Sequence, residues 1–573
     1  MRLNFRKMKT LRLFRVIFAI LFFAAISLQF FDIYHKLPKI YYMYPPASLQ
    51  FMPSLLKFLA GIGIASAWAF LAFSALALIL GRAYCSFICP FGILMDIFRK
   101  IAKFPAENKF LKKTAVGKFS QKNFAKLKYA KPLTALRVLF LTLAAISIVF
   151  GFGALLGLID PYSLYGKIMS AGFIISSEAV NFSASSAASF GYYGITPATT
   201  AAVSVAAFGF SIFLLILTAA VSAKSGRLFC NSLCPVGAFL GGLSKFALFS
   251  LQIDKDQCVS CGKCERDCKA KCINIKEKDI DFSRCVLCLD CAAHCPKSSI
   301  GYKINPAYKK IFSKSSRKAE GENISRRSFA AAAASMATAL FGCKKGDEEL
   351  SQKHSLKVLE GASEYRIDGA RADKRLPSPP GSISIENFLE NCTACQRCVS
   401  SCKSQVLKAS TTQWGLSGFM QPYMDFSAAF CLPDCHNCSK ACPTGAIRFI
   451  TKKQKMSEKI GTAIFNRELC VVYTDGTDCA ACAEHCPVQA IEMIPFNEKK
   501  SLYIPHVHED VCIGCGACEN VCPVRPHTAI VIQGLKVHKK AIPFDEKMRL
   551  YVPQEKSKAE VSAPKPLDNP FPF

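Results

Sequence analysis

The sequence is short of acidic residues. Its 573 residues include 41 Asp and Glu against 72 Lys and Arg, which gives a formal net charge of +31. An excess of this size is also found in proteins that bind nucleic acid. Here, however, the basic residues gather beside apolar runs: residues 99–131 hold eleven Lys and Arg and one acid, Glu107. That is the positive-inside pattern of membrane proteins, so we expect a membrane and no nucleic acid as a partner.

Histidine is missing where a membrane haem would need it. All nine histidines lie outside the long apolar runs, which excludes a haem held between two histidines within a bilayer. The sequence also has no molybdopterin, nucleotide or catalytic-nucleophile signature, so it lacks the parts of a cytoplasmic catalytic subunit. Electrons that cross a membrane in this protein therefore have to use iron–sulphur, thiol or quinone chemistry.

Long apolar runs, in contrast, are present: Val16–Phe31, Phe58–Leu80, Val138–Leu158 and Thr199–Ala223. The last three are long enough for a bilayer, which needs roughly 20 residues, and the first is shorter. Their basic flanks place the N-terminus, the loop 99–131 and the region after Ala223 in the cytoplasm. The Ser- and Gly-rich stretch Ala171–Ala198 is predicted to be an outer loop, because a further span would break the symmetry of the following repeat.

The segment after the second apolar run recurs after the fourth. Residues 81–92 and 226–237 both read G-R-x-x-C-x3-C-P-x-G. Cysteines four residues apart lie on one face of a helix, and two such pairs related by a pseudo-twofold axis can converge. Four thiolates suit one more iron–sulphur cluster, or the pairs work as redox dithiols; inert thiols in a structural turn are the plain alternative. We favour a redox site formed by Cys85, Cys89, Cys230 and Cys234.

Most of the thirty cysteines have the spacing of metal ligands rather than of disulfides. A first two-cluster ferredoxin pattern consists of Cys258, Cys261, Cys264 and Cys268, followed by Cys285, Cys288, Cys291 and Cys295. In this pattern the fourth cysteine of each run binds the other cluster. Lys269 stands where Pro usually follows Cys268, and Cys272 lies one helical turn further on. Either thiol is therefore a candidate fourth ligand, and the x3 spacing favours Cys268.

Four further runs follow in the last third of the chain. They are Cys392, Cys395, Cys398 and Cys402; Cys431, Cys435, Cys438 and Cys442; Cys470, Cys479, Cys482 and Cys486; and Cys512, Cys515, Cys518 and Cys522. These sets match four cubanes, so that six [4Fe–4S] clusters are expected in all. The segments 446–449, 490–493 and 529–532 are rich in β-forming residues, as α+β ferredoxin modules require.

An export signal separates the two cysteine-rich parts. Arg326 and Arg327 precede an uncharged run that ends at Cys343, which is the pattern of a twin-arginine signal. We expect this segment to form a fifth membrane crossing that places the following clusters outside. Residues 340–343 also resemble a lipobox, so Cys343 is a candidate for lipidation with cleavage. An uncleaved anchor is the interpretation that we favour.

These patterns predict a membrane α-helical domain of four transmembrane helices combined with α+β ferredoxin-like modules that bind [4Fe–4S] clusters. The expected order is a transmembrane domain (1–250), a cytoplasmic two-cluster ferredoxin (251–305), a linker with the signal (306–345), a second linker (346–385), an exported four-cluster domain (386–545) and a tail (546–573).

The two halves each resemble a known family. Residues 1 to about 305 resemble the NapH family, with four spans, two C-x3-C-P motifs and a two-cluster ferredoxin; residues from about 322 resemble the NapG family, with a twin-arginine signal and four cubane motifs. The resemblance implies a natural fusion in the bacterial inner membrane, with the first ferredoxin cytoplasmic and the second cluster domain periplasmic. It implies oxidation of menaquinol and electron delivery to a periplasmic reductase, directly or through a cytochrome c. Nitrate reductase is expected first and nitrous oxide reductase next.

The resemblance also implies how the four later runs exchange their fourth cysteines: the first run with the fourth, and the second with the third. Lys403, like Lys269, stands where Pro often follows, and the x8 gap after Cys470 also departs from the family pattern. An alternative function is an assembly, maintenance or redox-regulatory factor for a metalloenzyme, in which the membrane thiols handle copper or reduce a partner. The sequence leaves open whether the chain is itself a menaquinol dehydrogenase.

Overall fold

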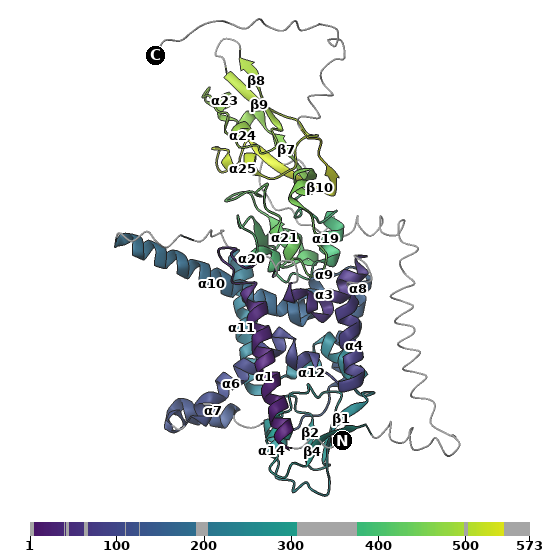
Figure 1. The fold of residues 1–573 in the computed structure, drawn as a ribbon. Coiled ribbons are helices and arrows are strands. Elements are labelled where there is room, and N and C mark those ends of the chain that lie inside the picture. The colour runs from purple at the N-terminus through teal and green to yellow at the C-terminus, as the bar shows by residue number, and fades with distance from the viewer. Residues whose placement is uncertain are drawn as a thin grey trace, which may run out of the picture.

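The computed structural model describes residues 5–38, 41, 45–61, 67–108, 110–124, 127–190, 197, 204–305, 375–497 and 502–543. The segment with Arg326, Arg327 and Cys343, the linkers around it up to residue 374 and the tail from residue 544 lie outside these residues. Figure 1 shows the described part as three blocks in a row: a small ferredoxin-like module, a helical bundle, and a second, longer cysteine-rich module.

The helical bundle is formed by the first half of the chain. Its elements are α1 (Phe5–Leu28), η1 (Pro46–Leu49), α3 (Phe51–Leu59), α4 (Trp68–Leu80), α5 (Tyr84–Phe87), α6 (Pro90–Glu107), η3 (Leu111–Lys113), α7 (Ala115–Phe124), α8 (Thr134–Val149), α9 (Gly153–Ile159), α10 (Pro161–Ser189), α11 (Val205–Ser225), α12 (Leu228–Ser232) and α13 (Pro235–Ser244). Helix α1 packs against α5 and α6, and α13 packs against α4 and α8.

Two helical segments in the described residues are long and apolar enough to cross a membrane: Met8–Leu28 and Val205–Ser225. The other two predicted runs form shorter helices. Helix α4 has 13 residues and α8 has 16, and α8 ends where Gly151, with φ of 70°, turns the chain into α9. By length and composition, therefore, two of the four predicted spans are supported as candidates.

The stretch Ala171–Ala198, predicted to be an outer loop rather than a further span, is helical over most of its length, because residues 161–189 form helix α10; α10 is not among the candidate spans in the described residues. The Asp160 carboxylate caps this helix by accepting a hydrogen bond of 2.8 Å from the Ser163 backbone, and Pro161 occupies the first turn. Serines inside the helix bond back to the preceding turn, as Ser176 Oγ does to the Gly172 oxygen. Figure 1 shows α10 extending sideways at the end of the bundle rather than along α11.

The first module contains β1 (Phe249–Ile253), α14 (Lys263–Asp267), β2 (Ile273–Asn274), β3 (Asp279–Ile280), α15 (Asp290–Ala293) and β4 (Ile300–Ile304). Strand β1 pairs with β4 antiparallel, with Ile253 opposite Ile300, and β2 pairs with β3. Its buried side chains form one continuous core with those of the bundle. The first module and the bundle therefore pack as a single unit.

The second module contains α19 (Ile385–Asn391), α20 (Arg397–Ser400), β5 (Leu407–Ala409), η5 (Leu416–Gly418), β6 (Pro422–Met424), α21 (Asn437–Ala441), α22 (Lys452–Met456), β7 (Glu458–Phe465), η6 (Arg467–Leu469), α23 (Val471–Thr474), α24 (Ala481–Glu484), β8 (Ile491–Asn497), β9 (Leu502–Val507), α25 (Ala517–Val521) and β10 (Ile530–Lys540). Its strands form antiparallel pairs: β5 with β6, β7 with β10, and β8 with β9.

Two of the three predicted strand segments of this module are confirmed. Segments 490–493 and 529–532 lie largely in β8 and β10. The prediction for 446–449 is wrong, because the Arg448 amide bonds to the Gly381 oxygen in a loop rather than within a strand.

Candidate metal centres

One cavity in the first module is lined by four cysteines: Cys258, Cys261, Cys264 and Cys295. Three of them belong to the first cysteine run, and Cys295 belongs to the next. Pairing of β1 with β4 explains this arrangement, since Cys258 follows β1 and Cys295 precedes β4. The exchange of a fourth cysteine that the spacing predicted is therefore present in the geometry.

Two cavities of the second module have the same composition. One is lined by Cys402 together with Cys431, Cys435 and Cys438; the other is lined by Cys522 together with Cys470, Cys479 and Cys482. The three cavities enclose similar spaces of about 340, 350 and 360 Å³. Similar size and the same four ligands indicate the same kind of occupant.

This geometry corrects the exchange implied by the family resemblance. Cys402 of the first run lies with the second run, and Cys522 of the fourth run lies with the third. The pairing of first with fourth and second with third is therefore wrong. The physical reason is local: the hairpin β5–β6 folds the second run back onto the first, so that α20 packs on α21, while α24 packs on α25.

The other cysteines of the six runs form three further groups of four. In each group burial, and then the neighbouring thiols, raise the pKa of the third cysteine of the run, and these neighbours include two thiols from the partner run, of which its fourth cysteine acts more strongly. The groups are Cys285, Cys288, Cys291 and Cys268; Cys392, Cys395, Cys398 and Cys442; and Cys512, Cys515, Cys518 and Cys486. Each of these groups combines three thiols of one run with the fourth cysteine of its partner run.

Cys268 and Cys272 remain alternative ligands. Their sulphur atoms lie 3.6 Å apart and both side chains are buried. No cysteine in the described ranges forms a disulfide. No three His, Cys, Asp or Glu side chains within these ranges lie close enough to share one metal ion. The four-cysteine groups fit a four-iron cubane, in which each thiolate binds a separate iron.

The membrane motif also brings its four thiols together, as the repeat predicted. Cys85, Cys89, Cys230 and Cys234 are all buried. Burial, and then the thiols of Cys230, Cys89 and Cys85, raise the pKa of Cys234. The pairs from the two copies of the repeat therefore form one buried four-thiol site between α5 and α12.

The arginine of each copy of the repeat donates a hydrogen bond to a backbone oxygen of the other copy. Arg82 donates to the backbone oxygen of Cys230 at 2.9 Å, and Arg227 donates to the backbone oxygen of Cys85 at 2.5 Å. Arg227 also forms a bidentate salt bridge with the Asp96 carboxylate, with N–O distances of 2.9 and 2.8 Å. Both arginines are almost fully buried. Two cations therefore stand beside four thiols that become negative when they bind metal.

The glycine that ends each copy makes room for this crossing. A β-carbon on Gly237 would lie 2.2 Å from the Cys230 oxygen and 2.7 Å from Arg82 Nη2. A β-carbon on Gly92 would meet the Cys85 oxygen and Arg227 Nη1 at 2.8 and 3.3 Å. The Arg and Gly of the repeat thus have a role in the site that the sequence analysis did not assign, although their recurrence was visible.

The four-thiol site lies directly against the first module. Ser86 Oγ donates to the oxygen of Leu287, which lies within the second cysteine run, at 3.3 Å. Lys269 forms ion pairs of 3.1 Å with Asp96 of the bundle and with Asp290 of the same run. Residues of the repeat, the neighbouring Asp96 and Arg12 of α1, which forms an ion pair of 2.6 Å with Asp290, thus join the bundle to this run.

The second module is seated on the opposite end of the bundle (Figure 1). Its first cysteine run packs on two glycines, since a β-carbon on Gly157 or Gly166 would lie 2.1 Å from the backbone oxygen of Thr393 or Cys395. Beneath this run, the buried Lys167 ammonium donates to the Gly157 oxygen at 2.7 Å. Cysteine groups therefore lie at both ends of the bundle.

Comparisons with known proteins agree with these groups. A family model described as a 4Fe-4S binding domain matches residues 62–109 and 205–253, and each match contains one copy of the repeat. A model described as a 4Fe-4S dicluster domain matches residues 477–525. No solved structure matches the chain.

Among curated proteins, the chain is 33% identical over 165 residues to the ferredoxin-type protein NapG of Escherichia coli (strain K12), which covers 27% of this chain and 68% of the relative. It is 31% identical over 165 residues to the methylamine utilization ferredoxin-type protein MauM of Methylorubrum extorquens, covering 28% and 73%. It is 31% identical over 153 residues to the ferredoxin-type protein NapF of Escherichia coli (strain K12), covering 26% and 82%.

Proposed function

Since the chain belongs to the family of ferredoxin-type proteins that includes NapG, we propose that it oxidises menaquinol at the inner membrane and passes the electrons to a periplasmic reductase. Iron–sulphur electron transfer is the role that the relatives support. Menaquinol as the donor, a nitrate reductase as the first expected acceptor and fusion to a NapH-like half are the further steps of the proposal. The observation that carries it is the apolar bundle with cysteine groups at both ends.

The six four-cysteine groups are proposed to hold six [4Fe–4S] clusters. Such clusters supply one-electron transfer. Within the second module the first two cysteine runs contact the last two, because the Cys431 amide donates to the Cys515 oxygen at 2.9 Å. This hydrogen bond joins a cysteine group of the first two runs to one of the last two, and therefore supports a continuous electron route along the module.

The four-thiol site is proposed to hold a seventh iron–sulphur cluster rather than two redox dithiols. Both matches to the 4Fe-4S binding domain centre on this repeat. Arg82 and Arg227, held by backbone and carboxylate oxygens, offset the negative charge that four thiolates bring into a buried place.

Exposed apolar side chains support the membrane location. They occur on all four helices that correspond to the predicted spans, with exposures of 65% for Leu21, 56% for Leu71, 60% for Val138 and 63% for Ile216. Large apolar side chains exposed together in this way mark contact with a membrane or partner. We propose four spans at these helices, of which α4 and α8 are the two shorter ones.

We propose that the first module is cytoplasmic and the second periplasmic. The two modules pack against opposite ends of the bundle, which agrees with this topology (Figure 1). Residues 306–374 join the two modules, and the signal with Arg326 and Arg327 is the proposed crossing.

Two buried tyrosines, Tyr84 and Tyr162, belong to the core cluster that contains thiols of the four-thiol site and Cys395 of the second module. Burial, and then Cys89, raise the pKa of Tyr84; burial, and then Cys395, raise the pKa of Tyr162. These side chains support an aromatic route between the two cysteine groups.

The test uses the full chain purified without oxygen. Six cubanes predict about 24 iron atoms per chain, and a seventh predicts about 28. A menaquinol analogue is expected to bleach the visible absorbance of the clusters, as dithionite does. Bleaching by dithionite without bleaching by any quinol would overturn the proposed donor.

A further inference from the structure

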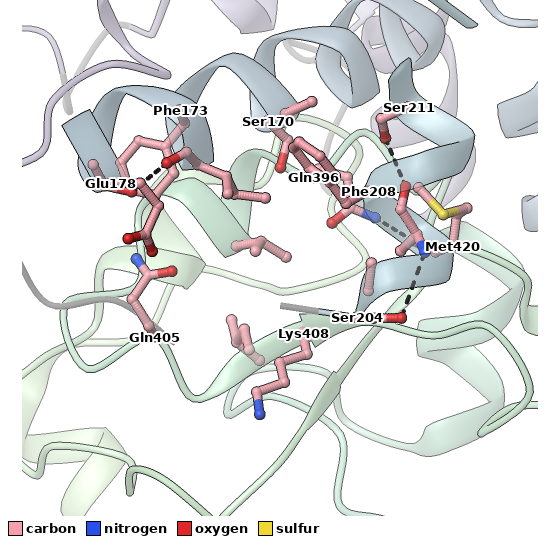
Figure 2. Close-up of a pocket in the computed structure, with 17 residues that line it drawn as sticks. Ser170, Phe173, Glu178, Ser204, Phe208, Ser211, Gln396, Gln405, Lys408 and Met420 are labelled. Atoms are coloured by element: carbon pink, nitrogen blue, oxygen red, sulfur yellow. Dashed lines mark hydrogen bonds between the residues drawn. The ribbon is translucent and has the colours of Figure 1, made fainter. Parts of the chain in front are cut away.

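A cavity lies where the second module meets the bundle (Figure 2). It opens between α10, α11 and the segment from Gln396 to Met420, and the space there, open solvent included, is about 650 Å³. The cavity differs from the cysteine cavities in size and in lining, because no cysteine lines it.

The walls of this cavity are mostly apolar, with a few polar groups. Phe173, Phe208 and Met420 contribute apolar surface, and Gln396 and Glu178 are among the polar lining residues. Figure 2 shows the Glu178 carboxylate directed toward Gln405 across the cavity. Apolar walls with a few oriented polar groups are what a flat, amphipathic ring requires.

Gln396 contributes an acceptor that the described residues leave without a partner. Its side chain is 2% exposed and its amide nitrogen donates to the Met420 oxygen, while Oε1 has no hydrogen-bond partner in the described part of the chain. A buried acceptor without a partner costs about 1–3 kcal/mol. A ligand with a hydroxyl group at this place would remove that cost.

We propose that this cavity binds the ring of the membrane quinol, with one ring hydroxyl donating to Gln396 Oε1. The inference rests on the proposed function and adds the place of the reaction. Gln396 directly follows Cys395 and lies two residues before Cys398, so a ring held there lies beside the first cysteine group of the second module.

The surroundings suit an isoprenoid tail. Helices α10 and α11 expose Ile175, Phe182 and Val205 near the cavity, with exposures of 51%, 75% and 84%. A tail that leaves between the two helices would cover this apolar surface, while the ring stays at the module.

The reaction balances with groups named here. Oxidation of the hydroquinone to the quinone breaks two O–H bonds and releases two protons and two electrons. Glu178, which is exposed at the cavity, accepts the two protons one after the other and passes each to water. The electrons leave one at a time through the iron–sulphur groups proposed for the second module to the reductase.

A matched pair of substitutions tests the site by binding. Ser177 lines the cavity, whereas its neighbour Ser176 does not. Ser177→Trp is expected to weaken binding of a naphthoquinone analogue to the full-length protein by about tenfold or more, and Ser176→Trp to leave it within about twofold. A photoreactive azidonaphthoquinone is expected to label peptides from 170–178 or 396–420, and excess menaquinol to suppress that label.

The Glu178→Gln variant tests the proton acceptor separately. It is expected to bind the analogue as the wild type does and to slow bleaching by menaquinol, while bleaching by dithionite stays unchanged. Equal bleaching rates in the two proteins would remove Glu178 from the proposal.

The outcomes separate this inference from the proposed function. If menaquinol bleaches wild type and Ser177→Trp at the same rate and the label falls elsewhere, the cavity is not the quinol site although quinol oxidation stands. If no quinol reduces the wild type, the proposed function itself is overturned. Iron content equal to wild type in every variant is the control for folding.

Discussion

The guanidinium of Arg227 donates a hydrogen bond to the backbone oxygen of Cys85, which belongs to the other copy of the repeat. Arg82 makes the reciprocal bond to Cys230. The two copies are therefore locked together by their own motif residues, and neither thiol pair is complete without the other copy. Gly92 and Gly237 leave the space in which the arginines cross.

The first prediction concerns this crossing. Gly237→Ala places a β-carbon against the Cys230 oxygen and Arg82, and is expected to destabilise the protein by about 1–3 kcal/mol because backbone has to move. Gly242→Ala is the matched control on the same helix, since its β-carbon meets nothing within 4 Å. The control is expected to be neutral or to stabilise by about 0.5–1 kcal/mol. Thermal unfolding measures both, and equal effects would contradict the crossing.

The second prediction tests how cysteine runs exchange ligands. Cys402→Ser combined with Cys435→Ser removes two ligands of one cluster, so a loss of about four iron atoms is expected. Cys402→Ser combined with Cys515→Ser touches two clusters, and a loss of about eight is expected. Iron analysis with EPR of the reduced protein distinguishes them. The reverse result would restore the exchange between the first and fourth runs.

The third prediction concerns the Asp96 carboxylate, which forms the salt bridge with Arg227. Burial alone would raise the pKa of Asp96, but the cations of Arg227 and Lys269 outweigh it and lower that pKa below its usual value. Asp96 therefore stabilises the folded state above its unfolded pKa of about 3.9, and this contribution is lost as pH falls through the lower folded pKa.

Asp96→Asn is expected to cost about 3–5 kcal/mol at pH 7, because it leaves buried cations without their counter-charge. The difference from wild type is expected to shrink in acid. Unfolding by denaturant at several pH values measures this, and a difference that stays constant down to the acid limit would argue against the ion pair.

The fourth prediction concerns export. A reporter fused after Phe573 is expected to lie outside the membrane in the native chain, and replacement of Arg326 and Arg327 by Lys is expected to keep it inside. Protease protection in spheroplasts measures the side. A reporter inside the cell with the native arginines would overturn the topology but not the cysteine groups.

Spacing within a run is a local property, so the sequence alone predicts which cysteines belong to one run. The convergence of Cys85, Cys89, Cys230 and Cys234 followed from an internal repeat, which fixes symmetry before any contact is known. The identity of the run that supplies the fourth cysteine to a group depends on contacts between distant parts of the chain. In the second module it depends on the β5–β6 hairpin, which folds the second run onto the first, and the family resemblance alone implied the wrong pair of runs.

Helix α10 was missed for a related reason. Ser and Gly are loop signals in water, but serines that bond back to the preceding turn are tolerated within an apolar helix, as Ser176 shows. The cavity beside α10 was also beyond prediction, because it is formed by residues from the bundle and from the second module.

The tight packing of the Cys395 backbone oxygen against Gly166 has a consequence for the partner protein. A module packed this tightly on the bundle does not swing between donor and acceptor as a tethered carrier would. In the proposed function the reductase then has to approach the part of the second module around α24, which lies away from the bundle (Figure 1). There Cys479, Cys482 and Cys486 are half-buried and His485 is exposed, so the residues around α24 would decide which partner receives the electrons.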